Sequence, residues 1–266
     1  MYLGKQIRMR RIIDSYSKRT IIVPMDHGIT LGPIDGLVDV RKTMQDMVEG
    51  GANALILHKG LMSFAHELNN KDLGLIMHLS ASTILDTYNN SKVLVSTVEE
   101  AICHGADCVS VHLNIGNMNE SSMLKDVGRV SATCERFGMP LLIMVYARGP
   151  QIVDEYALEH VAHCARVGME LGADMVKVVY SGSVETFAQV IDSCAVPVVI
   201  AGGEEIKSTF DILQMAQEAI IAGATGLSVG RNVFQHSDRI NLVRALSAIV
   251  HDNADVDTAL DLVENI

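Results

Sequence analysis

The sequence predicts a parallel (β/α)8 barrel, or TIM barrel, within the α/β fold class. Three observations support this: eight short apolar segments alternate with segments of helical periodicity, four helical segments end in a Gly-Ala step, and 266 residues suit such a barrel. A doubly wound open sheet would show the same alternation. It is the weaker interpretation, because the GxGxxG fingerprint of dinucleotide-binding sheets is missing after the first strand.

The strands are expected at 20–26, 54–58, 73–79, 108–113, 140–146, 175–180, 197–201 and 226–229. Helical segments follow at 38–49, 121–137, 155–171, 183–193, 208–222 and 239–251. At Gly51, Gly105, Gly172 and Gly223 the Gly-Ala steps are expected to end helices, because a left-handed residue stops a helix there. Residues 91–97 also read as a strand, and we interpret them as an extended piece within the third βα connection.

Both ends of the chain predict short helices outside the barrel. Residues 3–13 form a basic amphipathic pattern, which is more typical of a helix packed under the domain or at a subunit contact than of a membrane anchor. Residues 1–19 are therefore expected to be a helical extension, and 255–266 an acidic C-terminal helix. Since no linker or low-complexity segment interrupts the chain, 1–266 is expected to form one domain.

Composition narrows the function classes. The net charge of −11 argues against nucleic acid and anionic membranes as main partners. No apolar run approaches the length of a transmembrane helix, and the N-terminus lacks the apolar region of a signal peptide. Five cysteines without a CxxC pair suggest free thiols, so a cytoplasmic location is expected.

Lys177 lies in the middle of the strand expected at 175–180, among apolar residues typical of a strand buried on both faces. A buried ammonium is costly unless it is paired or neutralised. A lowered pKa would leave Lys177 as a neutral amine, which is a nucleophile toward carbonyls. The alternative is that Lys177 forms a buried ion pair.

In a barrel the active site lies at the carboxyl ends of the strands, where this sequence places several polar residues. Asp26 ends the first strand and Tyr146 ends the fifth, so both are expected on the same inner rim as Lys177. The amine could form a Schiff base with a ketone while Asp26 and Tyr146 transfer protons. The alternatives are that Asp26 caps the following turn and that Tyr146 is a phenol hydrogen-bonded to backbone at the edge of the core.

A phosphate site is expected after the last two strands. Gly202 and Gly203 follow the seventh strand, and Gly230 and Arg231 follow the eighth. Bare backbone N–H groups at these two loops, with a helix beginning beyond, form the usual barrel phosphate site, and Arg231 adds a fixed positive charge. The alternative is that the glycines only allow tight turns.

Four histidines, His27, His58, His78 and His112, end or follow the first four strands. Together they could bind Zn²⁺ or Fe²⁺ in a metal-dependent lyase. They lack a compact ligand spacing, so no metal and no cofactor is expected. A barrel that binds a phosphorylated ligand without catalysis would need the glycine loops and Arg231, but neither Lys177 nor Tyr146.

Several motifs resemble those of the archaeal-type class I aldolase family, over roughly residues 15–266. They are Val-Pro-Met-Asp-His-Gly at 23–28, Tyr-Ala-Arg-Gly at 146–149, Val-Lys at 176–177, Ala-Gly-Gly at 201–203 and Val-Gly-Arg-Asn at 229–232. The resemblance implies a TIM barrel with a Schiff base on Lys177 and proton transfer by Asp26 and Tyr146. The substrate contacts that it implies are Asp26, His27, Gly28, Ile29, Thr30, Tyr146, Ala147, Arg148, Lys177, Gly202, Gly203, Gly230 and Arg231.

Longer stretches at 23–37, 58–60 and 230–236 resemble a transaldolase-type branch of this family. That branch acts on 6-deoxy-5-ketofructose 1-phosphate and L-aspartate semialdehyde, at the entry to 3-dehydroquinate and the aromatic amino acids in archaea. The resemblance also implies a homo-oligomer, and a decamer within the family. Fructose-bisphosphate aldolases of the family carry the same lysine and tyrosine, so bisphosphate cleavage is the alternative function.

Overall fold

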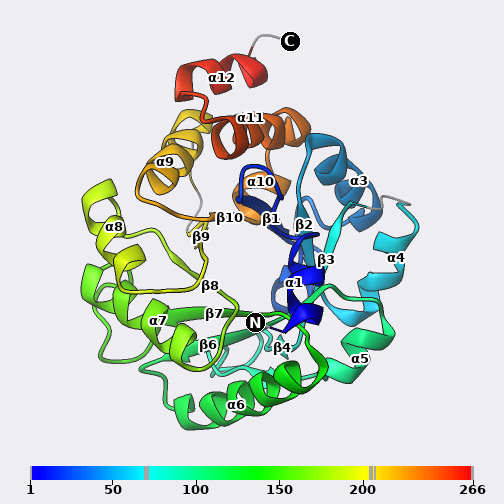
Figure 1. Cartoon of the computed structure of the whole chain (residues 1–266), viewed down its shortest axis with the longest axis vertical. Helices are drawn as coiled ribbons and strands as arrows, with labels where there is room; N and C mark the ends of the chain where they lie inside the picture. The colour runs from blue at the N-terminus through cyan, green and yellow to red at the C-terminus, as the bar shows by residue number, and fades with distance from the viewer. Residues whose placement is uncertain (1, 69–71, 204–205, 207, 265–266) are drawn as a thin grey trace.

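The computed structural model describes residues 2–68, 72–203, 206 and 208–264. Eight parallel strands close into a barrel in the order β1-β10-β9-β8-β7-β6-β3-β2, and Figure 1 looks into this barrel with helices in a ring around it. The strands are β1 (Thr20–Pro24), β2 (Ala54–Leu57), β3 (Gly74–His78), β6 (Cys108–Ile115), β7 (Leu141–Ala147), β8 (Met175–Val179), β9 (Val198–Ala201) and β10 (Gly226–Ser228). The predicted TIM barrel and its strands are confirmed.

The larger helices follow the barrel strands and cover their outer faces. They are α3 (Val40–Gly50), α5 (Val98–Cys103), α6 (Glu120–Phe137), α7 (Leu158–Glu170), α8 (Val184–Asp192), α9 (Thr209–Ile221) and α11 (Arg239–Asp252). Shorter pieces are α2 (His27–Leu31), η1 (Lys59–Leu61), α4 (Met62–His66) and α10 (Arg231–Phe234). The C-terminal helix α12 (Val256–Glu264) packs outside α11 (Figure 1), and residues 265–266 of the predicted helix lie outside the described residues.

The segment expected at 91–97 contains only the two-residue strand β5 (Val93–Leu94). It pairs antiparallel with β4 (Ser80–Ala81), which directly follows β3. This small sheet stands apart from the barrel sheet, so the interpretation of 91–97 as an extended piece of the third βα connection is confirmed.

The four Gly-Ala steps lie at the amino end of the barrel, which we call the floor. All four predicted cap glycines have positive φ, as a left-handed helix end requires. The side chains that follow three of these steps each accept a hydrogen bond from a backbone N–H of the adjacent strand. The bonds are Ile21 N–H to Asn53 at 2.6 Å, Leu75 N–H to Asp107 at 2.9 Å and Leu141 N–H to Asp174 at 3.0 Å.

The N-terminal helix α1 (Leu3–Met9) packs across this floor. Lys5 is buried there, with its Nζ 2.9 Å from Asp174 Oδ2 and 2.9 Å from Glu135 Oε2. Of the two placements expected for the basic N-terminus, under the domain or at a subunit contact, the structure has the first, and the helix is shorter than the predicted 3–13. The chain leaves the helix after Met9, and Arg11 then reaches Asp107 with its Nε at 3.3 Å and donates from its guanidinium to the Leu73 carbonyl.

No helix within the described ranges combines the length and the apolar character needed to cross a membrane.

Candidate active site

A cavity of about 320 Å³ opens at the carboxyl ends of the barrel strands. Most of the predicted contacts line it: Asp26, His27, Thr30, Tyr146, Arg148, Lys177, Gly202, Gly203, Gly230 and Arg231. Gly28 and Ile29 lie within α2 but are exposed, because His27, Thr30 and Leu31 form the face of that helix that turns toward the cavity. Ala147 lines a second cavity next to the first.

Lys177 lies in β8 with its side chain in this cavity and only 6% of the residue exposed. Among the described residues it has no hydrogen bond or ion pair, so the alternative of a buried ion pair finds no support. Burial lowers the pKa of Lys177 to about 8, although the negative charge of Asp26 opposes the shift. The neutral form at pH 7 is therefore roughly 300-fold more populated than for an ordinary lysine.

Asp26 follows β1 and occupies the cap position of α2, but its side chain makes no capping hydrogen bond. Its carboxylate oxygens lie 3.6 Å from His27 Nδ1 and 3.7 Å from His78 Nε2. Burial alone would raise the pKa of Asp26, but His78 and His27, which are protonated in the acid range where Asp26 titrates, and Lys177 outweigh it and hold the pKa well below its usual range. Asp26 is therefore an ionised proton acceptor at neutral pH.

Tyr146 lies near the end of β7 and is buried between two side chains. The guanidinium carbon of Arg148 lies 4.4 Å from its ring centroid, and the His112 ring lies 4.9 Å away. Within the described residues its hydroxyl has no hydrogen-bond partner, unlike the alternative of a phenol bonded to backbone. Burial raises the pKa of Tyr146 above its usual value, so the phenol remains a proton donor at neutral pH.

The loops after β9 and β10 meet at one side of the cavity. Gly202 and Gly203 lie in the first loop, Gly230 precedes α10, and Arg231 begins it. Arg231 donates to the Gly203 carbonyl at 3.3 Å, and Asn232 donates to the Gly202 carbonyl at 2.9 Å. We call Gly202, Gly203, Gly230 and Arg231 the glycine anion site.

The strand-end histidines make hydrogen bonds and ring contacts around Asp26. His78 Nδ1 lies 2.8 Å from Ser110 Oγ, and the His58 and His78 rings are 5.3 Å apart. Burial lowers the pKa of His78 to about 4, so its imidazole is neutral at pH 7. In the described part of the chain no group of three or more His, Cys, Asp or Glu side chains is arranged to hold a metal ion.

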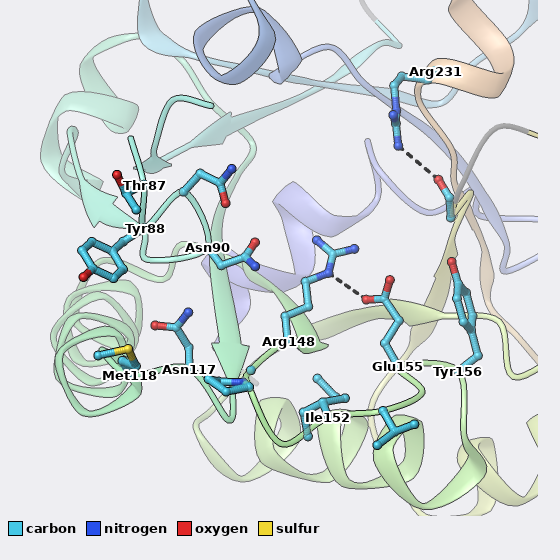
Figure 2. Close-up of a pocket in the computed structure, with 16 residues that line it drawn as sticks. Thr87, Tyr88, Asn90, Asn117, Met118, Arg148, Ile152, Glu155, Tyr156 and Arg231 are labelled. Carbon is cyan, nitrogen blue, oxygen red and sulfur yellow. Dashed lines mark hydrogen bonds and ion pairs between the residues drawn. The ribbon is translucent and has the colours of Figure 1, made fainter. Parts of the chain in front are cut away.

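The sequence did not predict that the connection between β4 and β5 contributes residues to the site. Asn89, Asn90 and Lys92 from this connection line the cavity that holds Lys177. Asn89 and Asn90 also line the second cavity, of about 800 Å³, which is drawn in Figure 2 and shares Arg148 and Arg231 with the first. These residues belong to an irregular connection without a motif, and only the extended pattern at 91–97 marked the region in the sequence.

Comparisons with known proteins agree with this site. The chain matches the family model described as DeoC/LacD family aldolase over residues 20–236. It is 44% identical over 257 residues to 2-amino-3,7-dideoxy-D-threo-hept-6-ulosonate synthase of Halobacterium salinarum, covering 97% of this chain and 95% of that protein. It is 37% identical to 2-amino-4,5-dihydroxy-6-oxo-7-(phosphonooxy)heptanoate synthase of Streptomyces griseus, covering 94% of this chain and 91% of that protein.

The fold is also close to solved aldolases. One is an archaeal fructose-1,6-bisphosphate aldolase with its catalytic lysine covalently bound to the carbinolamine intermediate of the substrate. It superposes with a TM-score of 0.86 at 30% identity, over 93% of this chain and 99% of that one. The aldolase resemblance seen in the sequence is thereby confirmed, and the chain belongs to the DeoC/LacD family of aldolases.

Proposed function

We propose that this protein is a Schiff-base enzyme that transfers a fragment of a keto sugar to an aldehyde, with Lys177, Tyr146 and Asp26 as catalytic residues. The observation that carries the proposal is Lys177 itself, a buried amine without an ion-pair partner among the described residues, whose pKa is lowered to about 8. Such an amine is poised to attack a ketone at neutral pH.

In the proposed reaction, Lys177 Nζ attacks the ketone carbon and forms a carbinolamine, which loses water to give an iminium. A carbon–carbon bond then breaks and its electron pair moves into the iminium. An aldehyde leaves, and an enamine remains on Lys177. The enamine carbon then attacks the acceptor aldehyde, whose oxygen takes a proton, and hydrolysis frees the product. Tyr146 is protonated at neutral pH and donates protons, and Asp26 is ionised and accepts them.

The names of the relatives indicate the product. The Halobacterium name describes a seven-carbon acid with an amino group at carbon 2 and a ketone at carbon 6. The Streptomyces name describes the same positions with a phosphate on carbon 7. We propose that this chain is 2-amino-3,7-dideoxy-D-threo-hept-6-ulosonate synthase and joins a fragment of 6-deoxy-5-ketofructose 1-phosphate to L-aspartate semialdehyde.

We propose that the glycine anion site binds the phosphate group of the keto sugar. Backbone N–H groups and a guanidinium at the start of a helix suit a phosphate. Arg231→Ala should therefore weaken borohydride trapping of 6-deoxy-5-ketofructose 1-phosphate roughly 10- to 150-fold, and that of its dephosphorylated analogue much less. An equal loss for both ketones would mean that Arg231 is structural.

The proposed function is tested by trapping with sodium borohydride and each candidate sugar, followed by mass spectrometry. We expect a reduced adduct on Lys177 with 6-deoxy-5-ketofructose 1-phosphate, coupled product when L-aspartate semialdehyde is added, and full activity in EDTA. Activity that is lost on chelation and restored by Zn²⁺ or Fe²⁺ would contradict the Schiff-base mechanism.

A second candidate is class I fructose-bisphosphate aldolase. The similarity of the fold to the archaeal aldolase solved as a carbinolamine favours it. Fast cleavage of fructose 1,6-bisphosphate without coupled product would select this function, with the same three residues in the same roles.

We also propose that the protein works in the cytoplasm as a homo-oligomer, a decamer by the family resemblance. All five cysteines are free thiols, which suits a reducing compartment. Light scattering of the purified protein measures its mass and would contradict the proposal if only monomers of 28.8 kDa are found.

A further inference from the structure

One acidic side chain in the described part of the chain, Glu155, lines the second cavity. It lies in the connection between β7 and α7, and its side chain is 24% exposed. Its Oε2 accepts a hydrogen bond from Arg148 Nε at 2.7 Å, whereas its Oε1 has no hydrogen-bond partner among the described residues. Figure 2 shows the carboxylate pointing toward Arg148, with the ring of Tyr156 beside it. One oxygen of Glu155 is therefore available to a ligand in this cavity.

The other acid that lines either cavity, within the described residues, is Asp26. It lines the cavity that holds Lys177, where it faces His27 and His78. Lys177 does not line the second cavity, so Glu155 is removed from the reacting centre. A substrate with an ammonium group remote from its reacting carbon therefore meets Glu155 as the acid outside that centre.

The second cavity adjoins the glycine anion site. Gly203 and Arg231 line both cavities, and Arg148 does so too. The loop that carries Glu155 packs against the glycine loop, because a Cβ added to Gly203 would lie 3.3 Å from the hydroxyl oxygen of Tyr156. The end of a substrate that reaches Gly203 and Arg231 therefore also reaches the cavity that holds Glu155.

In the proposed reaction, the leaving aldehyde and the acceptor aldehyde occupy the same place in turn. The aldehyde that leaves carries the phosphate of the sugar at its far end. The acceptor reacts with the same enamine carbon, so its aldehyde carbon takes the position of the one that left. L-aspartate semialdehyde has a carboxylate at its far end, at a similar distance from the aldehyde carbon. The carboxylate is therefore directed to the anion-binding groups that the phosphate has vacated, around Gly203, Arg231 and Arg148.

The two aldehydes differ in one charged group. L-aspartate semialdehyde has an ammonium on the carbon next to its carboxylate, and this carbon becomes the 2-amino position in the name of the Halobacterium relative's product. The phosphorylated aldehyde carries no cation. An acceptor whose carboxylate is held by Arg148 or Arg231 brings this ammonium into the second cavity, where the open oxygen of Glu155 suits it as a charge-assisted partner.

We propose that Glu155 binds the α-ammonium of the aldehyde acceptor and so selects an amino aldehyde over the phosphorylated aldehyde that leaves. This inference rests on the proposed function, since it takes the position of the acceptor from the Schiff base on Lys177 and the phosphate at the glycine anion site. The sequence placed Glu155 only at the start of the helix expected at 155–171, whereas α7 begins at Leu158 and leaves Glu155 in the loop before it.

The test measures coupling with two acceptors at saturating 6-deoxy-5-ketofructose 1-phosphate. L-aspartate semialdehyde carries the amino group, and succinic semialdehyde is the same molecule without it. Glu155→Gln removes the negative charge but keeps an oxygen that can accept from Arg148. It should raise KM for L-aspartate semialdehyde roughly 10- to 150-fold and change that for succinic semialdehyde by less than about threefold.

Two further variants make the test specific. Glu155→Asp keeps the charge and should retain part of the preference for the amino aldehyde. Glu159→Gln is the matched control, since Glu159 is exposed in the first turn of α7 and lines neither cavity, and it should leave both KM values unchanged. Borohydride trapping of the sugar on Lys177 should persist in Glu155→Gln, which shows that the variant is folded.

The outcomes separate the inference from the function beneath it. If wild type couples neither aldehyde, the proposed function fails, and Glu155 has no acceptor to bind. If wild type couples both but Glu155→Gln raises both KM values equally, Glu155 acts by holding Arg148 and the inference is overturned. If wild type couples both and Glu155→Gln raises neither KM, the ammonium is bound elsewhere and the inference is again wrong.

Discussion

Two of the lysines that the structure describes are buried, at opposite ends of the barrel, and their environments differ in one respect. Lys5 on the floor is 4% exposed and Lys177 at the mouth is 6% exposed. Lys5 has two carboxylates at 2.9 Å, whereas Lys177 has no ion pair among the described residues. Burial alone would lower the pKa of both amines, yet the partners Glu135 and Asp174 raise that of Lys5 while that of Lys177 falls to about 8.

Burial by itself therefore does not make a lysine reactive. What differs is whether the fold supplies a carboxylate within ion-pair distance. Asp26 acts on Lys177 through its charge but is not within ion-pair distance of it, so the amine is only partly compensated. The same chain thus uses one buried lysine to hold the floor together and, in the proposed function, the other as a nucleophile.

The largest effect is expected from removing the unpaired amine. Lys177→Met should abolish turnover and borohydride trapping, because no other described lysine lies on a barrel strand; Lys92, which also lines the cavity, lies in the connection between β4 and β5. The same change should raise the free energy of unfolding by about 3 kcal/mol at pH 7, since it removes a buried amine whose pKa is lowered from 10.5 to about 8. Urea unfolding followed by circular dichroism measures this, and a destabilised variant would mean that Lys177 has a partner in the folded protein.

The next effect concerns the charge that faces Lys177. Asp26→Asn should slow turnover roughly 10²- to 10⁴-fold, because a proton acceptor is lost. Trapping of substrate at pH 7 should persist, because removing the negative charge lowers the pKa of Lys177 further. Trapping rates measured beside turnover check this, and loss of both together would show that Asp26 is needed to form the Schiff base.

The paired lysine should respond in the opposite way. Lys5→Met is expected to lower the free energy of unfolding by roughly 3 kcal/mol, because Asp174 stays buried without its cation. Glu135 is half exposed and contributes less. Activity per folded molecule should be close to wild type, and Lys125→Met on the exposed face of α6 is the control. Unchanged stability would show that the floor does not depend on this ion pair.

The smallest effect is a difference in pH dependence. The folded-state pKa of Lys177 lies below its unfolded value of 10.5, so the unfolded chain binds more protons between about pH 8 and 10.5 and stability rises there. The advantage of Lys177→Met should therefore shrink across this window. The stabilisation from Lys5 is present below pH 10.5 and is lost above it, as the pH passes its raised pKa.

Unfolding of wild type and both variants between pH 7 and 10.5 tests the slope expected for Lys177, and measurements above pH 10.5 test the opposite slope expected for Lys5. Trapping by wild type should also rise about tenfold per pH unit up to pH 8 and then level off, as the amine loses its proton. A trapping rate that still rises steeply above pH 9 would contradict a lowered pKa.

The sequence by itself determined the barrel, its strands and the identity of the candidate nucleophile. Hydrophobic periodicity and glycine caps are local signals, and a lysine inside an apolar strand is visible without knowing its neighbours. Tyr146, Asp26 and the glycine loops could also be predicted from the sequence, because the ends of parallel strands meet at one edge in any such barrel.

Only the tertiary structure decided which charges meet. Barrel closure and the packing of α1 place Lys5 against Asp174 and leave Lys177 unpaired among the described residues, and neither contact distance is encoded in local pattern. The same holds for Lys92, which an irregular connection without periodicity brings into the cavity. Ion pairing depends on ångström distances between segments remote in sequence, and a pattern along the chain carries no information about those distances.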